Sequence, residues 1–188
     1  MFLGHFALGI AAKPSAPKIP AWALLIAPQA MDLLFLPLVA LGIEGFEQGP
    51  YGQDHIQAFY THSLVGALII SAIMFWIGKK AWKTNFHGWL LAGLSFSHWP
   101  IDLLVHHQDL PLLPGNLGNF PLLGLGLWDF PYLIYGIEIL LAVMGIGLYF
   151  NWTKKAHASS HWYLDPTIVT ILFALMSLSD LFRLPAFQ

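Results

Sequence analysis

The 188-residue sequence contains no cysteine and little charge. Without cysteine there can be no disulfide bond and no thiolate metal ligand, so any metal must be held by histidine and carboxylate groups. Charged residues make up only 10% of the chain, and the formal net charge is -2. So few basic residues leave no positive stripe along which a phosphate backbone could lie, which argues against nucleic acid as a partner.

Apolar residues, by contrast, are abundant. They make up 57% of the chain and give a mean hydropathy of +0.64, outside the usual balance of a soluble domain. Segments long enough to cross a hydrocarbon core of about 30 Å lie at residues 19–43, 56–78, 86–107, 131–151 and 165–184. We predict an all-α polytopic membrane protein, a bundle of about five transmembrane helices plus a short N-terminal half-helix at 2–12, forming one integral membrane domain over 1–188.

The basic residues predict how the bundle is oriented. Loops on the cytoplasmic side of membrane proteins carry an excess of lysine and arginine. If the basic turn at 13–18 is cytoplasmic, alternate crossings place every lysine on that side and only Arg183 outside. An odd number of spans then leaves the C-terminus outside.

His98, Asp102 and His106 stand four residues apart within an apolar segment. This spacing places them along one face of a helix, and ionisable groups inside a membrane usually face a partner or a water-filled cavity. The segment has no lysine or arginine, so Asp102 needs a partner from elsewhere. The pattern is typical of metal ligands, and the alternative is a neutral His–Asp hydrogen bond.

Ionisable residues of other segments are expected at compatible depths. At about 1.5 Å per residue along each helix, they fall in the outer half of the bilayer or near its middle. The predicted metal ligands are His5, Asp32, His62, His98, Asp102 and His106. Glu138 lies about 10 Å into the fourth span and could be a general base, a ligand or a neutral packing group.

The connection at 109–130 mixes prolines and glycines with leucines and aromatic residues. It is too apolar for an ordinary solvated loop. We predict a lid or interfacial hairpin above the cluster, which would give an amphipathic substrate a route of entry. The alternative is a loop that only rests on lipid headgroups.

Short motifs follow one another in a characteristic order over roughly the first 110 residues. They are Gly4-His5, Pro28-Gln29-Ala30-Met31-Asp32, Thr61-His62-Ser63 and Ser97-His98-Trp99-Pro100-Ile101-Asp102. In this order they resemble the bacterial family of LexA-regulated, membrane-bound metal-dependent hydrolases and, more distantly, the zinc-dependent phospholipase C and P1 nuclease group. The chain departs from the family where it has Ala30 in place of a second Asp, and Gln57-Ala58 in place of His-Arg.

The resemblance implies a zinc-dependent enzyme of a bacterial inner membrane, with one or two zinc ions. It implies that Asp32, His62, His98 and Asp102 bind one metal, and that Asp102 bridges to a second metal held by His5. Asp102 and Glu138 are the predicted catalytic residues. Metal-activated water in the outer half of the bilayer, beneath an apolar lid, suits a phosphoesterase that takes a lipid or lipid-linked phosphate from the bilayer.

Other classes of protein stay open. A transporter of ions or small solutes could use the same buried His and Asp residues, but it needs a polar path to the cytoplasm, and the inner halves of the spans offer little. A membrane di-iron oxidase would need clustered His-x-x-His-His boxes, which the sequence lacks. A scaffold would not require a convergent polar cluster. The sequence does not predict the oligomeric state.

Overall fold

The computed structural model describes residues 2–156 and 163–187, and these are mostly helical, which confirms the all-α prediction. The helices are α1 (Phe2–Ala11), α2 (Ala21–Ile26), α3 (Ala30–Ala40), α4 (Leu64–Trp82), α5 (Asn85–Phe96), α6 (His98–Val105), α7 (Pro131–Ala156) and α8 (Leu164–Leu181). Short 3-10 turns lie at η1 (Lys13–Ser15), η2 (Ala27–Gln29), η3 (Pro114–Asn116), η4 (Leu127–Asp129) and η5 (Pro185–Phe187). Strands β1 (Gly45–Glu47) and β2 (His55–Gln57) form a small antiparallel hairpin.

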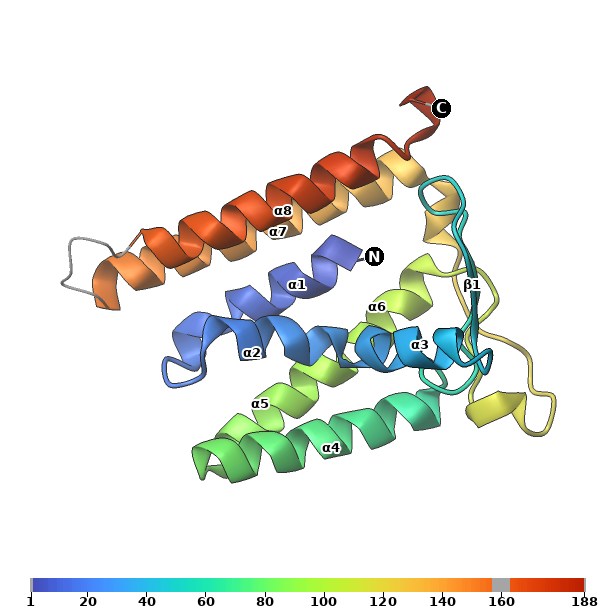
Figure 1. Cartoon of the computed structure of the whole chain (residues 1–188), viewed down its shortest axis with the longest axis horizontal. Helices are drawn as coiled ribbons and strands as arrows, with labels where there is room; N and C mark the ends of the chain where they lie inside the picture. Colours follow the sequence, from blue (N-terminus) through green and yellow to red (C-terminus); the bar gives the residue numbers. More distant parts are fainter. Residues whose placement is uncertain (1, 157–162, 188) are drawn as a thin grey trace.

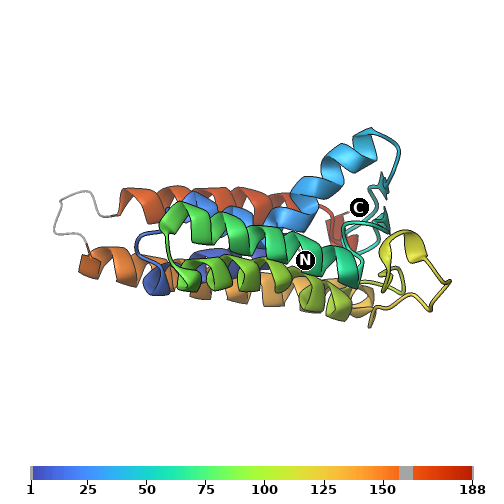
Figure 2. The same cartoon turned by 90° about the horizontal axis from the view of Figure 1, so that it is seen from below.

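The helices are arranged in three layers (Figure 1). Helices α7 and α8 lie side by side in one layer, α1 to α3 occupy the middle, and α4 packs along α5 in the third. The hairpin and the 109–130 connection gather at one end of the bundle, as the turned view shows (Figure 2). Helix α1 is buried between its neighbours, because Leu3, Ala7 and Ile10 pack against side chains of α7 and α8.

Four helical stretches are long and apolar enough to cross a membrane. They are Ala21–Ala40, which joins α2 to α3, and helices α4, α7 and α8. The segment expected as the third span is instead divided at Ser97 into α5, which packs along α4, and α6, which continues away from α4 (Figure 1). Pro100 has no N–H to donate to the carbonyl of Phe96, which accounts for the break.

The predicted start of the second span is wrong. Ile56 belongs to β2, and α4 begins only at Leu64, with Ser63 as its N-cap. The Ser63 hydroxyl accepts a hydrogen bond from the Gly66 N–H at 2.9 Å, which satisfies a donor that the first turn would leave free. His62 therefore lies in the loop before the helix, and a depth counted along a helix from Ile56 does not apply to it.

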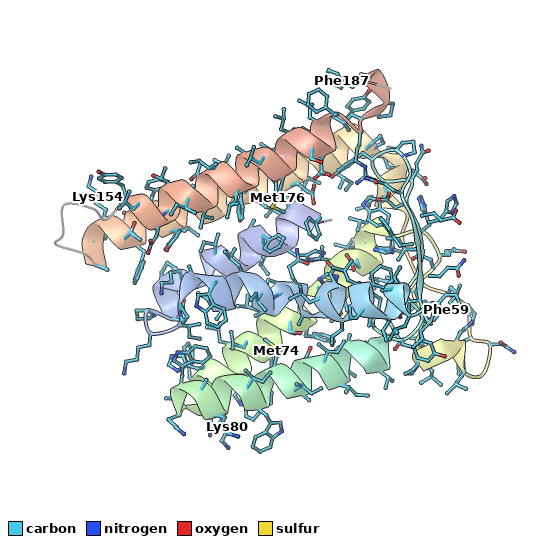
Figure 3. All side chains as sticks on the ribbon, viewed as in Figure 1. Phe59, Met74, Lys80, Lys154, Met176 and Phe187 are labelled. Carbon is cyan, nitrogen blue, oxygen red and sulfur yellow. The ribbon has the colours of Figure 1, made fainter. Side chains whose placement is uncertain are left out.

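The outer faces of the long helices are apolar. Large exposed side chains on α4, α7 and α8 include Ile69, Ile73, Leu140, Val143, Leu172 and Leu175. Lys80 and Lys154 lie at the end of the bundle opposite the hairpin (Figure 3). An apolar belt with basic residues at one end is compatible with a membrane protein.

Candidate metal centre

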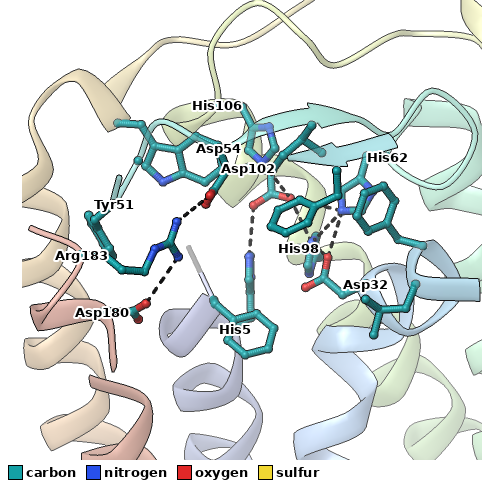
Figure 4. A pocket seen from close by; sticks show the side chains of 17 residues that line it. His5, Asp32, Tyr51, Asp54, His62, His98, Asp102, His106, Asp180 and Arg183 are labelled. Carbon is teal, nitrogen blue, oxygen red and sulfur yellow. Dashed lines mark hydrogen bonds and ion pairs between the residues drawn. The ribbon is translucent and has the colours of Figure 1, made fainter. Parts of the chain in front are cut away.

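The structure brings the six predicted ligands together beneath the hairpin (Figure 4). They come from α1 (His5), α3 (Asp32), the loop before α4 (His62), α6 (His98 and Asp102) and the residue that ends α6 (His106). Asp32 is partly exposed, and the other five are almost fully buried. Residues far apart in the sequence thus form one polar cluster in an otherwise apolar bundle.

Four ligand-type atoms of this cluster lie around its centre. They are Nε2 of His62, Nε2 of His98, Oδ1 of Asp32 and Oδ2 of Asp102. The two imidazole nitrogens lie 3.3 Å apart, and their distances to the two carboxylate oxygens run from 2.9 to 3.8 Å. Ligands about 2.0–2.1 Å from a tetrahedral zinc ion lie about 3.3 Å from one another. These separations suit a zinc ion, and Asp32, His62 and His98 form one group that could hold a metal ion.

Hydrogen bonds on the far side of His98 fix which ring nitrogen faces the centre. Its Nδ1 lies 2.7 Å from the carbonyl oxygen of Pro28, which η2 presents between α2 and α3. Because a carbonyl can only accept, Nδ1 carries the proton, and Nε2 of the neutral ring presents its lone pair to the cluster.

A longer relay does the same for His62. Nδ1 of His62 lies 2.9 Å from the Thr61 hydroxyl, which donates to Oε2 of Glu44 at 2.9 Å. The hydroxyl therefore accepts from Nδ1–H, and Nε2 of His62 is left with a lone pair. The Nε2 atoms of His62 and His98 face one another at 3.3 Å, and each also lies near a carboxylate oxygen, Asp32 at 3.2 Å and Asp102 at 2.9 Å. An Nε2–H that donates to its carboxylate would satisfy these atoms without a metal, and a metal ion bound in place of those protons would use the same lone pairs. The donor set of Asp32, His62 and His98 fits a metal ion.

This relay gives a testable prediction. Oε1 of Glu44 accepts from the backbone N–H groups of Tyr60 and Thr61, and Oε2 accepts from the Thr61 hydroxyl. Both carboxylate oxygens of Glu44 are therefore needed as acceptors. Glu44→Gln replaces one oxygen by a donor and is expected to weaken zinc affinity by about 10- to 100-fold, the usual cost of losing an outer partner of a ligand. Competition with a zinc chelator would measure it, and Glu47→Gln on the exposed side of β1 is the matched control.

His5 reaches the other oxygen of Asp102. Its Nε2 lies 3.1 Å from Oδ1 of Asp102, and its ring stacks on that of His98 with centroids 3.9 Å apart. Nδ1 of His5 is buried without a hydrogen-bond partner among the described residues. His5, His98 and Asp102 form a second group that could hold a metal ion, with His98 common to the two groups.

His106 and Glu138 occupy different places. Nε2 of His106 lies 3.7 Å from Oδ2 of Asp102, while its Nδ1 bonds Asp109 at 2.9 Å, so His106 stands at the edge of the cluster. Glu138 is buried, but its carboxylate accepts from the N–H of Gly4 and from the Tyr51 hydroxyl at 2.7 Å. These bonds tie α7 to α1 and to the hairpin, which is a structural role for Glu138. Its catalytic role stays a prediction.

Tyr51 is held in its protonated form by this arrangement. Burial and the adjacent Glu138 carboxylate raise the pKa of Tyr51 well above its usual range. The hydroxyl therefore remains a donor to Glu138 at physiological pH.

The cluster forms one wall of a cavity of about 300 Å³. A second wall is apolar and includes Phe2, Phe35, Leu36, Phe46 and Ile56. The wall across from the cluster carries Tyr51, Asp54, Asp180 and Arg183 (Figure 4). This third wall was not predicted from the sequence. The one sequence feature that pointed to it was Arg183, the basic residue that the predicted topology places on the side opposite the lysines.

Comparisons with protein-family models, with curated proteins and with solved structures found no match. The family resemblance therefore stays a prediction based on the four short motifs.

Proposed function

We propose that this protein is a membrane-embedded, metal-dependent hydrolase that cleaves a phosphoester in a lipid or lipid-linked phosphate. The observation that carries this proposal is the group of ligand atoms from Asp32, His62 and His98 in the wall of a cavity, with the Nδ1 atoms of both histidines bonded on the far side so that their Nε2 atoms face the group. Zinc bound there would lower the pKa of its water to about 7 and supply hydroxide for attack on phosphorus.

The residues around the centre suit that task. Asp102 presents Oδ2 to His98 and Oδ1 to His5, so it can bind one ion or bridge two. His106 is within reach of Asp102 at the edge, where it can bind a further ligand or orient the carboxylate. The apolar wall near Phe2 and Leu36 matches an acyl or isoprenoid chain, which supports an amphipathic substrate.

The position of the lysines supports a proposed orientation. The lysine-rich end is proposed to face the cytoplasm of a bacterial inner membrane, which puts the cluster and the hairpin toward the outer half of the bilayer. A substrate that resides in that leaflet would reach the cavity without leaving the membrane.

A transporter is the alternative, and the packing disfavours it. A permeating ion would have to pass from the cluster to the lysine-rich end. In that direction the space between the layers is filled by apolar side chains such as Ile10, Leu24, Leu91 and Tyr149. These side chains are closely packed, and they offer few groups to replace the hydration shell of an ion.

The experiment is metal analysis and turnover on the full chain in detergent. We expect about one or two equivalents of zinc, loss of at least about 100-fold in phosphoester hydrolysis on chelation, and recovery on adding zinc. Phosphatidate and a phosphodiester lipid are the substrates. A chain that takes up no metal after incubation with zinc contradicts the proposal. Ion flux into proteoliposomes without turnover would favour the transporter, and bound iron would favour an oxidase.

A further inference from the structure

Arg183 is the only arginine in the chain, and it lines the same cavity as the candidate metal centre. It follows α8 directly and faces the cavity from the wall opposite His5 and Asp102 (Figure 4). It is also the only lysine or arginine among the described residues that line this cavity. Apart from the histidines and Tyr51, the other ionisable acidic or basic side chains that line the cavity are aspartates.

The hydrogen bonds of the Arg183 guanidinium are only partly satisfied. Nη2 donates to the Gly49 carbonyl at 3.0 Å and to Oδ1 of Asp54 at 2.5 Å. Nη1 is 3.8 Å from the nearest oxygen of Asp180, beyond hydrogen-bond distance, and Nε is buried without a partner among the described residues. A guanidinium has five N–H donors, and the two on Nη1 make no hydrogen bond among the described residues, so they remain free to bind a ligand in the cavity.

We infer that Arg183 binds the phosphoryl group of the substrate from the side opposite the metal centre. The inference rests on the proposed function, since it assigns the anion to the same cavity. A planar guanidinium matches the oxygens of a phosphoryl group in a bidentate arrangement. Four carboxylates face the cavity, from Asp32, Asp54, Asp102 and Asp180, so an anion is stable only between Arg183 and a metal.

A different role for Arg183 would be to clamp the tip of the hairpin onto α8. The contacts with Gly49 and Asp54 serve that role, as does the bond from the Tyr51 N–H to the Arg183 carbonyl at 2.9 Å. Two substitutions separate the roles. Arg183→Gln removes the cation, whereas Asp54→Asn breaks the same ion pair but leaves the cation and frees its donors.

The test uses the full chain in detergent, loaded with zinc, and titrated with inorganic phosphate by calorimetry. Arg183→Gln is expected to weaken phosphate binding by about 10- to 100-fold, the cost of hydrogen bonds to a charged group. Arg183→Lys should bind phosphate more tightly than Arg183→Gln but more weakly than the unchanged chain, because an ammonium lacks the planar, paired N–H donors of a guanidinium. Asp54→Asn should bind phosphate as tightly as the unchanged chain or more tightly. Equal weakening in Arg183→Gln and Asp54→Asn would show a clamp and overturn the inference, as would unchanged binding in Arg183→Gln.

Two further measurements separate this inference from the proposed function. Phosphatidate in mixed micelles should displace phosphate if the anion belongs to a lipid headgroup, and failure to displace it would assign the site to free phosphate. Phosphate binding that depends on Arg183, without any ester hydrolysis, would keep the inference and overturn the hydrolase. Hydrolysis whose KM does not change in Arg183→Gln would keep the hydrolase and overturn the inference. Zinc content should be the same in all of these variants.

Discussion

Asp102→Asn is expected to abolish zinc binding and to reduce hydrolysis by about 1,000-fold or more. Asp102 completes the group that contains His5 and His98, because Oδ1 faces His5 at 3.1 Å and Oδ2 faces His98 at 2.9 Å, and Oδ2 also lies 3.8 Å from Nε2 of His62. The asparagine amide keeps the shape but loses the charge, and its NH2 group cannot bind a metal. Loss of the metal ion removes several kcal/mol of transition-state stabilisation. Each 1.36 kcal/mol corresponds to a tenfold change in rate.

Elemental analysis and phosphatidate turnover measure this effect, with circular dichroism to show that the helices remain. The matched control is Asp129→Asn, because Asp129 is exposed and its nearest ring, His107, lies outside the cluster. The control is expected to keep its zinc and its rate within about twofold, as exposed substitutions usually do. Tight zinc binding in Asp102→Asn would remove Asp102 from the metal centre.

The part of the site that lies on one helix was predictable from the sequence. His98 and Asp102 are one helical turn apart, and their side chains meet at 2.9 Å. Local spacing decides that contact whatever the rest of the chain does. The convergence of His5 and Asp32 on this pair was predicted from depth, because few other groups in an apolar bundle can accompany a buried carboxylate.

His62 joined the predicted set through the Thr61-His62-Ser63 motif and through a depth counted from a wrong helix boundary. The apolar run that begins near Ile56 suggested a span, but the hairpin takes Ile56 and the Ser63 cap starts α4 later. His62 still reaches the centre because the loop before the helix is tied by Trp99, whose indole N–H donates to the His62 carbonyl at 3.0 Å. Such a tertiary contact has no signature in local sequence.

The wall opposite the cluster was not predictable for the same reason. Its hairpin has three-residue strands, too short to show an alternating pattern, and the ion pair between Asp54 and Arg183 joins residues 129 positions apart. Glu44 likewise acts on His62 only through Thr61. Hydrophobic periodicity and motif spacing describe elements, whereas these contacts depend on how the loops fold over the bundle.

Gly9→Ala is expected to lower stability by about 2–3 kcal/mol, the upper part of the range for overfilling a packed interior. A Cβ at Gly9 would lie 2.2 Å from the carbonyl oxygen of Leu24 on α2. Backbone cannot rotate away as a side chain can, so α1 would have to move. It has no room on the far side, because Gly145 of α7 is so close to the Ala7 carbonyl that a Cβ there would lie 2.6 Å from it.

The matched control is Gly93→Ala in α5, where a Cβ would meet nothing within 4 Å. An exposed helical Gly93 should gain about 0.5–1 kcal/mol on becoming alanine, so the two variants are expected to shift thermal unfolding in opposite directions. Because His5 stands four residues before Gly9 on the same face of α1, displacing the helix also moves its ring away from Asp102. Gly9→Ala should therefore lower zinc affinity as well as stability. If stability fell while zinc affinity stayed unchanged, His5 would not be a ligand, and the centre would be limited to the four atoms contributed by α3, α6 and the loop before α4.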